Sequence, residues 1–113
     1  MSGMIGGFPY IEARFDKHAK LIDSTLEEIA KWVAQTGCSD VVVASHGWNN
    51  DMAQARDLYA RLFASVAQNL AEDNPPGLHG RSFGVVGILI RRIASHLVLN
   101  AEIHILPSRI SNW

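Results

Sequence analysis

The sequence has little cysteine, little net charge and no long hydrophobic run. A single cysteine, Cys38, cannot form an internal disulfide, which excludes a disulfide-stapled scaffold. Lys and Arg total 10 against 11 Asp and Glu, and the formal net charge of −1 gives no overall attraction to nucleic acid or to an anionic membrane. No stretch reaches the roughly 18 apolar residues that a membrane span needs. We therefore expect no nucleic-acid partner and no membrane partner.

Signals for export, nucleotide binding and metal binding are also missing. Residues 1–7 contain no basic residue and no long apolar run, so they do not resemble a signal peptide, and we expect a cytoplasmic protein. The glycine-rich patterns of nucleotide-binding loops are absent. No histidine has the H-E-x-x-H or Cys/His spacing that is typical of zinc ligands. The sequence predicts neither a cofactor nor a metal.

Two segments have the pattern of amphipathic helices. Ser24 and Glu27 have the spacing of a capping box, and Gly37 is a natural left-handed stop, which predicts a helix between them. A longer helix is predicted from about Asp51, whose charge suits the first turn, to about Glu72. The first helix is expected to bury a stripe of four apolar residues at helical spacing: Leu26, Ile29, Ala30 and Val33.

Strand patterns alternate with these helices. Residues 41–44 are wholly apolar and mostly β-branched, which predicts a central strand buried on both faces of a parallel sheet. Alternation over residues 8–16 predicts another strand, with Pro9 favouring an edge position, after a flexible N-terminus over residues 1–7. Residues 83–90 are expected to form an exposed edge strand, which predicts either a homo-oligomer formed through that edge or marginal stability. The order predicts an α/β fold: a mostly parallel sheet with two long helices.

The segment from Ser45 to Asp51 joins the predicted central strand directly to the second helix. Gly47 permits a tight bend, and the first helical turn presents unpaired N–H groups. Such groups can hold a carbonyl oxygen as it becomes an oxyanion, because the donors are fixed before the reaction starts. A tight strand-to-helix connection without chemistry remains the alternative interpretation of His46 and Gly47.

The run from Val41 to Trp48 resembles the third strand and the His-Gly-X oxyanion turn of the α/β-hydrolase family. The resemblance covers roughly residues 8–89. It implies that residues 8–90 are the N-terminal half of a partial three-layer α/β-hydrolase-like domain. It also implies an oxyanion hole for a small-molecule ester substrate, with Trp48 contributing its backbone N–H: His46, Gly47 and Trp48.

The other catalytic parts of that family are not found. A literal G-x-S-x-G pattern surrounds Ser82, but a Pro/Gly loop precedes it and a strand follows it where a helix belongs. We therefore interpret Ser82 as a loop serine and assign no nucleophile, acid or catalytic histidine. The sequence predicts the N-terminal part of a serine hydrolase, truncated before the nucleophile, that is inactive alone.

Residues 91–113 depart from the family's continuation. They carry three arginines against one glutamate, whereas the chain as a whole has net charge −1. We interpret them as a divergent tail with an extra strand that Pro107 ends. A shifted reading frame, a truncated gene and a divergent gene remain open as origins. The alternative function is a non-catalytic α/β module for binding or assembly, and a product without an evolved function is the third reading.

Overall fold

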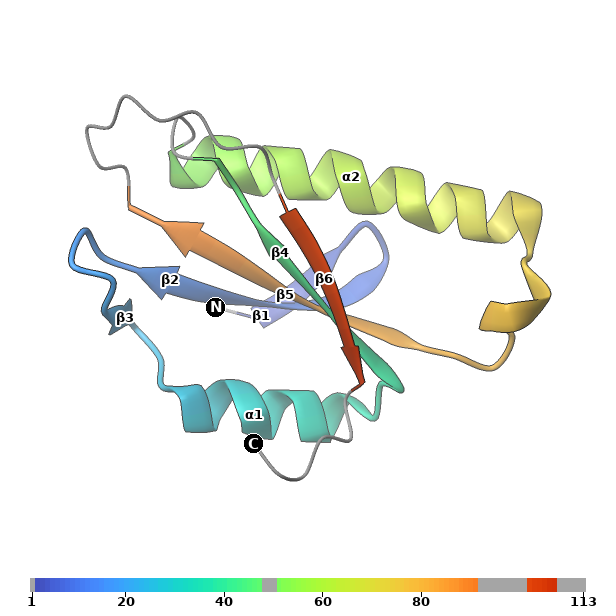
Figure 1. Cartoon of the computed structure of the whole chain (residues 1–113), viewed down its shortest axis with the longest axis horizontal. Helices are drawn as coiled ribbons and strands as arrows, with labels where there is room; N and C mark the ends of the chain where they lie inside the picture. The colour runs from blue at the N-terminus through green and yellow to red at the C-terminus, as the bar shows by residue number, and fades with distance from the viewer. Residues whose placement is uncertain (1, 48–50, 92–101, 108–113) are drawn as a thin grey trace.

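The computed structural model describes residues 2–47, 51–91 and 102–107, the last of these by their backbone. This part of the chain forms one six-stranded sheet, two α-helices and a short 3-10 helix (Figure 1). The strands are β1 (Ser2–Ile5), β2 (Phe8–Phe15), β3 (Leu21–Ile22), β4 (Asp40–Ser45), β5 (Phe83–Ile90) and β6 (Glu102–Pro107). The helices are α1 (Leu26–Thr36), α2 (Met52–Asp73) and the 3-10 helix η1 (Pro76–Leu78).

The centre of the sheet is parallel and its outer strands are antiparallel. The strand order is β1-β2-β5-β4-β6, and β3 pairs with β2. β5 runs parallel to both β2 and β4, whereas β1 and β3 are antiparallel to β2 and β6 is antiparallel to β4. The chain passes from β2 through α1 to β4, then returns through α2 to β5 between them. The predicted α/β class with a parallel central sheet and two helices is confirmed.

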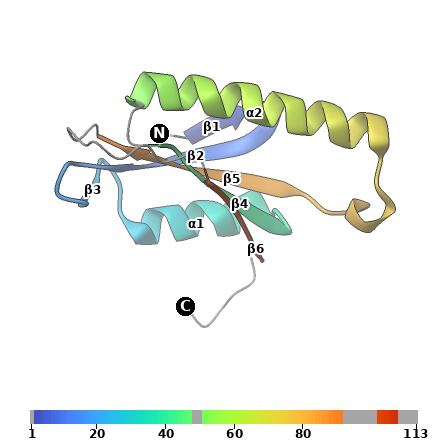
Figure 2. The same cartoon turned by 45° about the horizontal axis from the view of Figure 1, so that its top comes forward.

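The two helices cover opposite faces of the sheet (Figure 2). Successive residues of a strand point to opposite faces, so the apolar run of β4 is divided between two cores. The core under α2 is centred on Tyr59, Phe63, Val42, Val85 and Leu89. The core under α1 is made by Ile11, Val41, Val86, Trp32 and Val33. The prediction that β4 is buried on both faces is therefore confirmed.

The cap of α1 lies one residue beyond the predicted position. Thr25 is the N-cap, and its side chain and that of Glu28 form the capping box. The expected cap, Ser24, instead has a buried hydroxyl without a hydrogen-bond partner. Both pairs fit the same S/T-x-x-E pattern, so the pattern alone does not choose between them. Of the four residues expected in the buried stripe, Leu26 is 73% exposed and Ala30 is also exposed, whereas Ile29 and Val33 are half-buried. Gly37 ends the helix in the predicted left-handed conformation.

The second helix begins and ends as predicted. Asp51 is the N-cap of α2 and forms a capping box with Gln54. Asn74 closes the other end with a left-handed backbone, and its N–H donates to the carbonyl of Leu70. An aspartate at the cap also places negative charge at the positive end of the helix dipole.

The N-terminal region differs from the prediction in two respects. Ser2–Ile5, expected to be a flexible segment, form β1 and pair with β2. β2 is not an edge strand, although it contains Pro9. Pairing with β5 starts at Tyr10, one residue later, so the missing N–H of Pro9 removes no bond to β5.

The strand expected at the sheet edge lies in its centre. β5 is flanked by β2 on one side and by β4 on the other, so the prediction that it is an exposed edge available for self-association is wrong. The error arose because the chain order of strands does not reveal their order in the sheet. The outer side of β4 is paired with β6, which ends at Pro107 as predicted. The remainder of the predicted tail, residues 92–101 and 108–113, lies outside the described residues.

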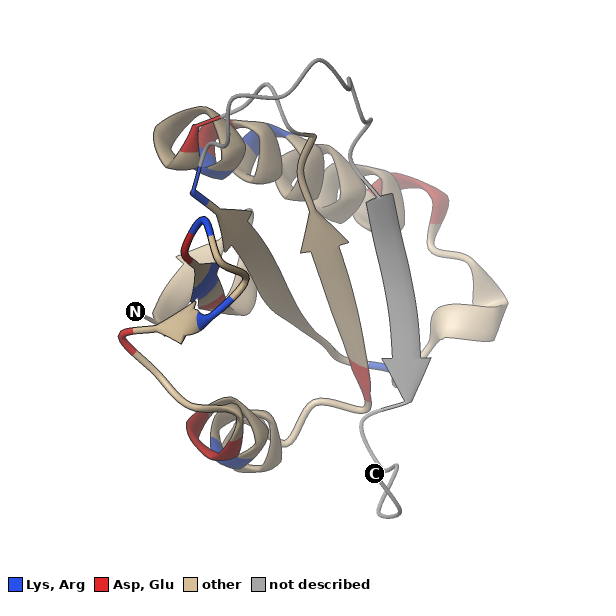
Figure 3. Ribbon diagram, turned by 60° about the vertical axis from the view of Figure 1, so that its left-hand side comes forward, with Lys and Arg blue, Asp and Glu red and all other residues tan. Residues whose placement is uncertain are grey.

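Charged residues of both signs are intermixed along the helices and around β3 (Figure 3). Side chains of both signs lie on the same helix: α2 carries Arg56 and Arg61 together with Asp57 and Glu72. Within the described ranges, no helix combines the length and the apolar character that a membrane crossing requires.

Candidate functional site

The turn after β4 lies at the carboxyl ends of the parallel strands, and two of its three predicted site residues are described. His46 and Gly47 are both buried and directly follow the last residue of β4. The third, Trp48, lies outside the described residues, as do residues 49 and 50. Asp51 resumes the described chain as the cap of α2.

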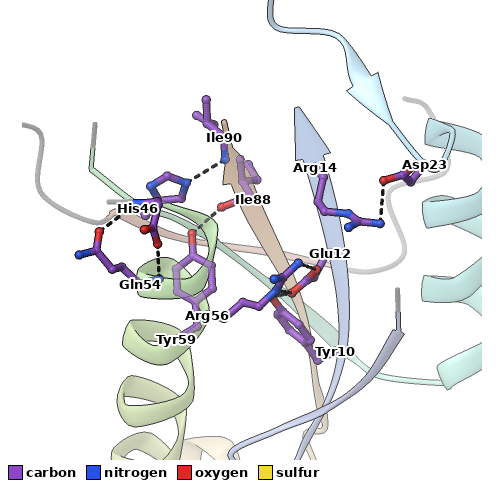
Figure 4. Close-up of polar contacts among 11 residues, drawn as sticks. Tyr10, Glu12, Arg14, Asp23, His46, Gln54, Arg56, Tyr59, Ile88 and Ile90 are labelled. Carbon is purple, nitrogen blue, oxygen red and sulfur yellow. Dashed lines mark hydrogen bonds and ion pairs between the residues drawn. The ribbon is translucent and has the colours of Figure 1, made fainter. Parts of the chain in front are cut away.

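His46 joins the end of β4 to the end of β5 (Figure 4). The backbone N–H of Ile90 donates to Nε2 of His46 over 2.8 Å, and Nδ1 of the same ring lies 2.7 Å from the carbonyl oxygen of Gly47. Because a backbone N–H can only donate, Nε2 is the acceptor and the hydrogen is on Nδ1. The ring is therefore a neutral imidazole with both nitrogens bonded to the main chain.

The register of the sheet explains why a side chain is needed at this point. The last parallel pair between β4 and β5 is Ala44 with Gly87. Beyond it β5 continues to pair with β2 as far as Ile90, so β5 and β4 part at their carboxyl ends. The imidazole of His46 spans this opening and satisfies an amide that β4 itself does not reach.

A buried ion pair between β2 and α2 was not predicted. Glu12 points from β2 toward α2, where Arg56 binds its carboxylate through two nitrogens at 2.6 and 2.8 Å (Figure 4). The hydroxyl of Tyr10 donates to the same carboxylate over 3.1 Å. Only 2% of Glu12 is exposed. Alternation placed Glu12 on the polar side of its strand, but that side is covered by α2.

The pKa values of this cluster follow from its contacts. Burial acts to raise the pKa of Glu12, but the hydrogen bonds from Arg56 and Tyr10 outweigh it and lower the pKa below the ordinary value of 4.5. Burial, together with the adjacent charge of Glu12, raises the pKa of Tyr10. Burial also raises the pKa of Tyr59, whose hydroxyl donates to the carbonyl of Ile88 over 2.6 Å. At neutral pH Glu12 and Arg56 are therefore charged, and Tyr10 and Tyr59 keep their hydroxyl protons.

The amino ends of β4 and β5 are joined by two serines. The backbone N–H of Ser39 lies 2.9 Å from both the hydroxyl and the carbonyl oxygen of Ser82. In return the N–H of Ser82 donates to the hydroxyl of Ser39 over 2.8 Å. Arg81 and Asp40 form an ion pair beside them, and hydrogen bonds from Arg81 and Ser39 lower the pKa of Asp40. The interpretation of Ser82 as a structural serine at a strand entrance is consistent with these bonds.

An apolar cavity opens at this same amino end, away from the predicted site. We call it the α2 cavity, because the second half of α2 forms its roof and the sheet its floor. Its volume is about 340 Å³. Its lining comes from β2, β4, β5, α2, η1 and the following loop: Phe8, Val42, Phe63, Val66, Leu70, Leu78, Arg81, Phe83 and Val85. Sequence patterns gave no signal for it, because the lining residues come from segments far apart in the chain.

The described residues do not assemble a nucleophile with a base. The two histidine rings with recorded partners bond to main-chain groups, His46 as above and His79 to the carbonyl oxygen of Asn74 at 3.2 Å. Nor do the described residues contain a group of three or more His, Cys, Asp or Glu side chains arranged to hold a metal ion. The thiol of Cys38 is buried and lies 3.2 Å from the hydroxyl of Thr36, so it has no access to a substrate in this conformation.

Comparison with known proteins adds no relative. No model of a protein family, no curated protein and no solved structure matches the chain.

Proposed function

We propose that His46 and Gly47 form the fixed part of an oxyanion-binding turn in a serine-hydrolase-like site for ester substrates. On this proposal, the chain is the N-terminal part of a three-layer α/β-hydrolase-like domain. The observation that carries the proposal is the anchoring of His46 by both ring nitrogens, one to Gly47 and one to Ile90. Oxyanion stabilisation requires donors that are already oriented before charge develops, and a turn tied to the neighbouring strand meets this requirement.

The bond from Nδ1 of His46 to the carbonyl oxygen of Gly47 holds the end of the described turn in place. The family resemblance assigns the oxyanion donor to the next residue, Trp48, which lies outside the described residues. His46 acts as a positioning residue in this proposal, not as a base, because neither of its nitrogens is available to a substrate.

The location of the turn supports the same proposal. Ligands of open α/β sheets bind at the carboxyl ends of the parallel strands, where His46 and Gly47 lie. The capped N-terminus of α2 begins at Asp51, four residues after Gly47, and adds the positive end of a helix dipole to this region.

The proposal assigns no nucleophile to this chain, so hydrolysis should stay at background. Incubation of the protein with p-nitrophenyl acetate is expected to release nitrophenolate no faster than buffer does. The Ser82→Ala variant should give the same rate of release. Ester hydrolysis that is well above background and is abolished by Ser82→Ala would show that the nucleophile has been missed.

Anion binding tests the turn itself. Acetate, the carboxylate product of an acetyl ester, is titrated into 15N-labelled protein while the amide signals are followed by NMR. We expect weak, saturable shifts centred on Gly47, which disappear in His46→Leu. His18→Leu is the matched control, because His18 is exposed and lies in the turn between β2 and β3. Shifts that are equal in both variants, or absent from the wild-type protein, would contradict the proposal.

One observation favours the second candidate, a non-catalytic α/β binding module. The α2 cavity lies at the amino ends of the strands, on the opposite side of the domain from the proposed oxyanion turn. A ligand held there would not reach His46, so binding would be its own function.

A further inference from the structure

The α2 cavity is lined almost wholly by apolar side chains. The sheet contributes Val42 and Val85 to its floor, α2 contributes Phe63 and Val66 to its roof, and η1 contributes Leu78. Arg81 is the one charged residue of the lining, and two of its guanidinium nitrogens already bind Asp40. The interior therefore offers a ligand apolar surface and no unpaired carboxylate or lysine.

A second, more open pocket adjoins the α2 cavity. It also measures about 340 Å³ and shares five lining residues with the α2 cavity: Phe8, Leu70, Leu78, Arg81 and Phe83. Its further lining includes Asn74 and His79 in the loop after α2. The change from an apolar interior to a rim with hydrogen-bonding groups is typical of small-molecule sites, whose volumes run from about 300 to 1,000 Å³.

We propose that the α2 cavity binds an amphipathic small molecule, with its apolar body beneath α2 and a hydroxyl-bearing head at the rim near His79. The size follows from volume: an apolar cavity of about 150 Å³ accepts benzene, so 340 Å³ accommodates a body of two fused rings or a comparable aliphatic chain. The head follows from the rim, where Nε2 of His79 binds the carbonyl oxygen of Asn74. This bond leaves Nδ1 of His79 as an acceptor and the side-chain amide of Asn74 as a donor for a ligand hydroxyl. This proposal does not rest on the hydrolase proposal, because the two sites lie at opposite ends of β4.

The test uses 1-naphthol and naphthalene as probes of the full chain. Their dissociation constants are measured from methyl shifts by NMR, below the solubility limit of each probe. We expect saturable binding of 1-naphthol that shifts the methyl groups of Val42, Val66 and Val85. Naphthalene should bind at least threefold more weakly, and His79→Ala should remove this preference. Equal affinity for the two probes would overturn the assignment of the head group, and absence of saturable binding would overturn the site.

A cavity-filling variant locates the binding. Val66→Phe places a ring inside the cavity and should raise the dissociation constant for 1-naphthol at least tenfold. Val33→Phe is the matched control, since Val33 packs from α1 against the other face of the sheet and should leave the constant unchanged. Circular dichroism shows whether Val66→Phe folds. If it does not fold, Leu78→Phe, which fills the same cavity from η1, takes its place. Equal binding in the filled and control variants would overturn the proposal.

Sedimentation distinguishes a small molecule from a second copy of the chain. If a dimer of the wild-type protein became monomeric in Val66→Phe, a second copy would be the occupant and the small-molecule proposal would be overturned. An unchanged oligomeric state, together with loss of 1-naphthol binding, supports the proposal.

Discussion

At their amino ends β4 and β5 are joined by reciprocal bonds between Ser39 and Ser82, whereas at their carboxyl ends they part and a single imidazole spans the opening. The first arrangement uses hydroxyl and main-chain groups of the entering strands and leaves the apolar α2 cavity beside it. The second ties a turn through the side chain of His46, and the hydroxyl of Tyr59 binds the carbonyl of Ile88 on the same part of β5. The amino end is suited to an apolar ligand, and the carboxyl end to fixed polar groups.

The largest expected effect is the loss of Arg56. Arg56→Met leaves the buried carboxylate of Glu12 without its cation, and removing one partner of a buried pair costs about 3 kcal/mol or more. Because Arg56 itself is 38% exposed, we expect a value near the lower limit, about 3 kcal/mol, in urea unfolding.

A double variant separates charge from packing. Glu12→Gln combined with Arg56→Met removes both charges while keeping an acceptor for Tyr10, and it should regain part of the lost free energy of unfolding. A double variant as unstable as Arg56→Met alone would show that the aliphatic part of Arg56, rather than its charge, stabilises this end of the sheet.

Acid should lower the free energy of unfolding by weakening the same ion pair. The decrease should be smaller than that caused by Arg56→Met, because protonation removes the charge of Glu12 instead of leaving it unpaired. The folded-state pKa of Glu12 lies below 4.5, so its contribution is present above pH 4.5 and is lost as the pH falls through the lower, folded-state pKa. Urea unfolding between pH 6 and pH 3 should show a steeper decline for the wild-type protein than for Glu12→Gln. Parallel declines would contradict the lowered pKa.

Substitution of two glycines of β5 compares the tightness of packing in the two halves of the strand. A Cβ at Gly87 would lie 2.5 Å from the hydroxyl oxygen of Tyr10, so Gly87→Ala should cost about 1–3 kcal/mol by overpacking. A Cβ at Gly84 would lie 3.0 Å from Sγ of Cys38, and Gly84→Ala should cost less. Thermal unfolding of the two variants measures the difference, and the reverse order would contradict the tighter packing of the carboxyl half.

The smallest expected effect is that of Ser82→Ala. The N–H of Ser39 would lose the Ser82 hydroxyl but keep the Ser82 carbonyl oxygen, so the free energy of unfolding should fall by about 0.5–1.5 kcal/mol. Hydrogen exchange at the Ser39 amide provides the measurement. A loss above about 3 kcal/mol would indicate a larger role for Ser82 than one hydrogen bond.

Local patterns predicted the elements whose causes are local. The extent of α2 follows from its apolar period and from Asp51 at its cap, and the burial of β4 follows from its unbroken apolar run. The end of α1 was likewise predicted from Gly37, which adopts the left-handed backbone conformation that ends the helix. The starting residue of α1 was missed by one because two overlapping capping boxes satisfy the same pattern.

Features that depend on distant residues could not be predicted in this way. Alternation placed Glu12 on the polar face of its strand, but the burial of that face depends on Arg56, 44 residues away. The central place of β5 depends on the crossover of α1, which chain order does not encode. The turn at His46 was found from its local sequence, whereas its bond to Ile90, also 44 residues away, was visible only in the fold.

The state of His46 tests the central claim, that this histidine is a fixed neutral anchor of the turn after β4. Its two ring nitrogens can be observed directly by 15N NMR of histidine-labelled protein at neutral pH. We predict a neutral ring with its hydrogen on Nδ1, Nε2 hydrogen-bonded, and an Ile90 amide whose exchange accelerates in His46→Leu. A charged ring, a hydrogen on Nε2, or an Ile90 amide that is indifferent to His46→Leu would contradict the anchor and the oxyanion turn built on it.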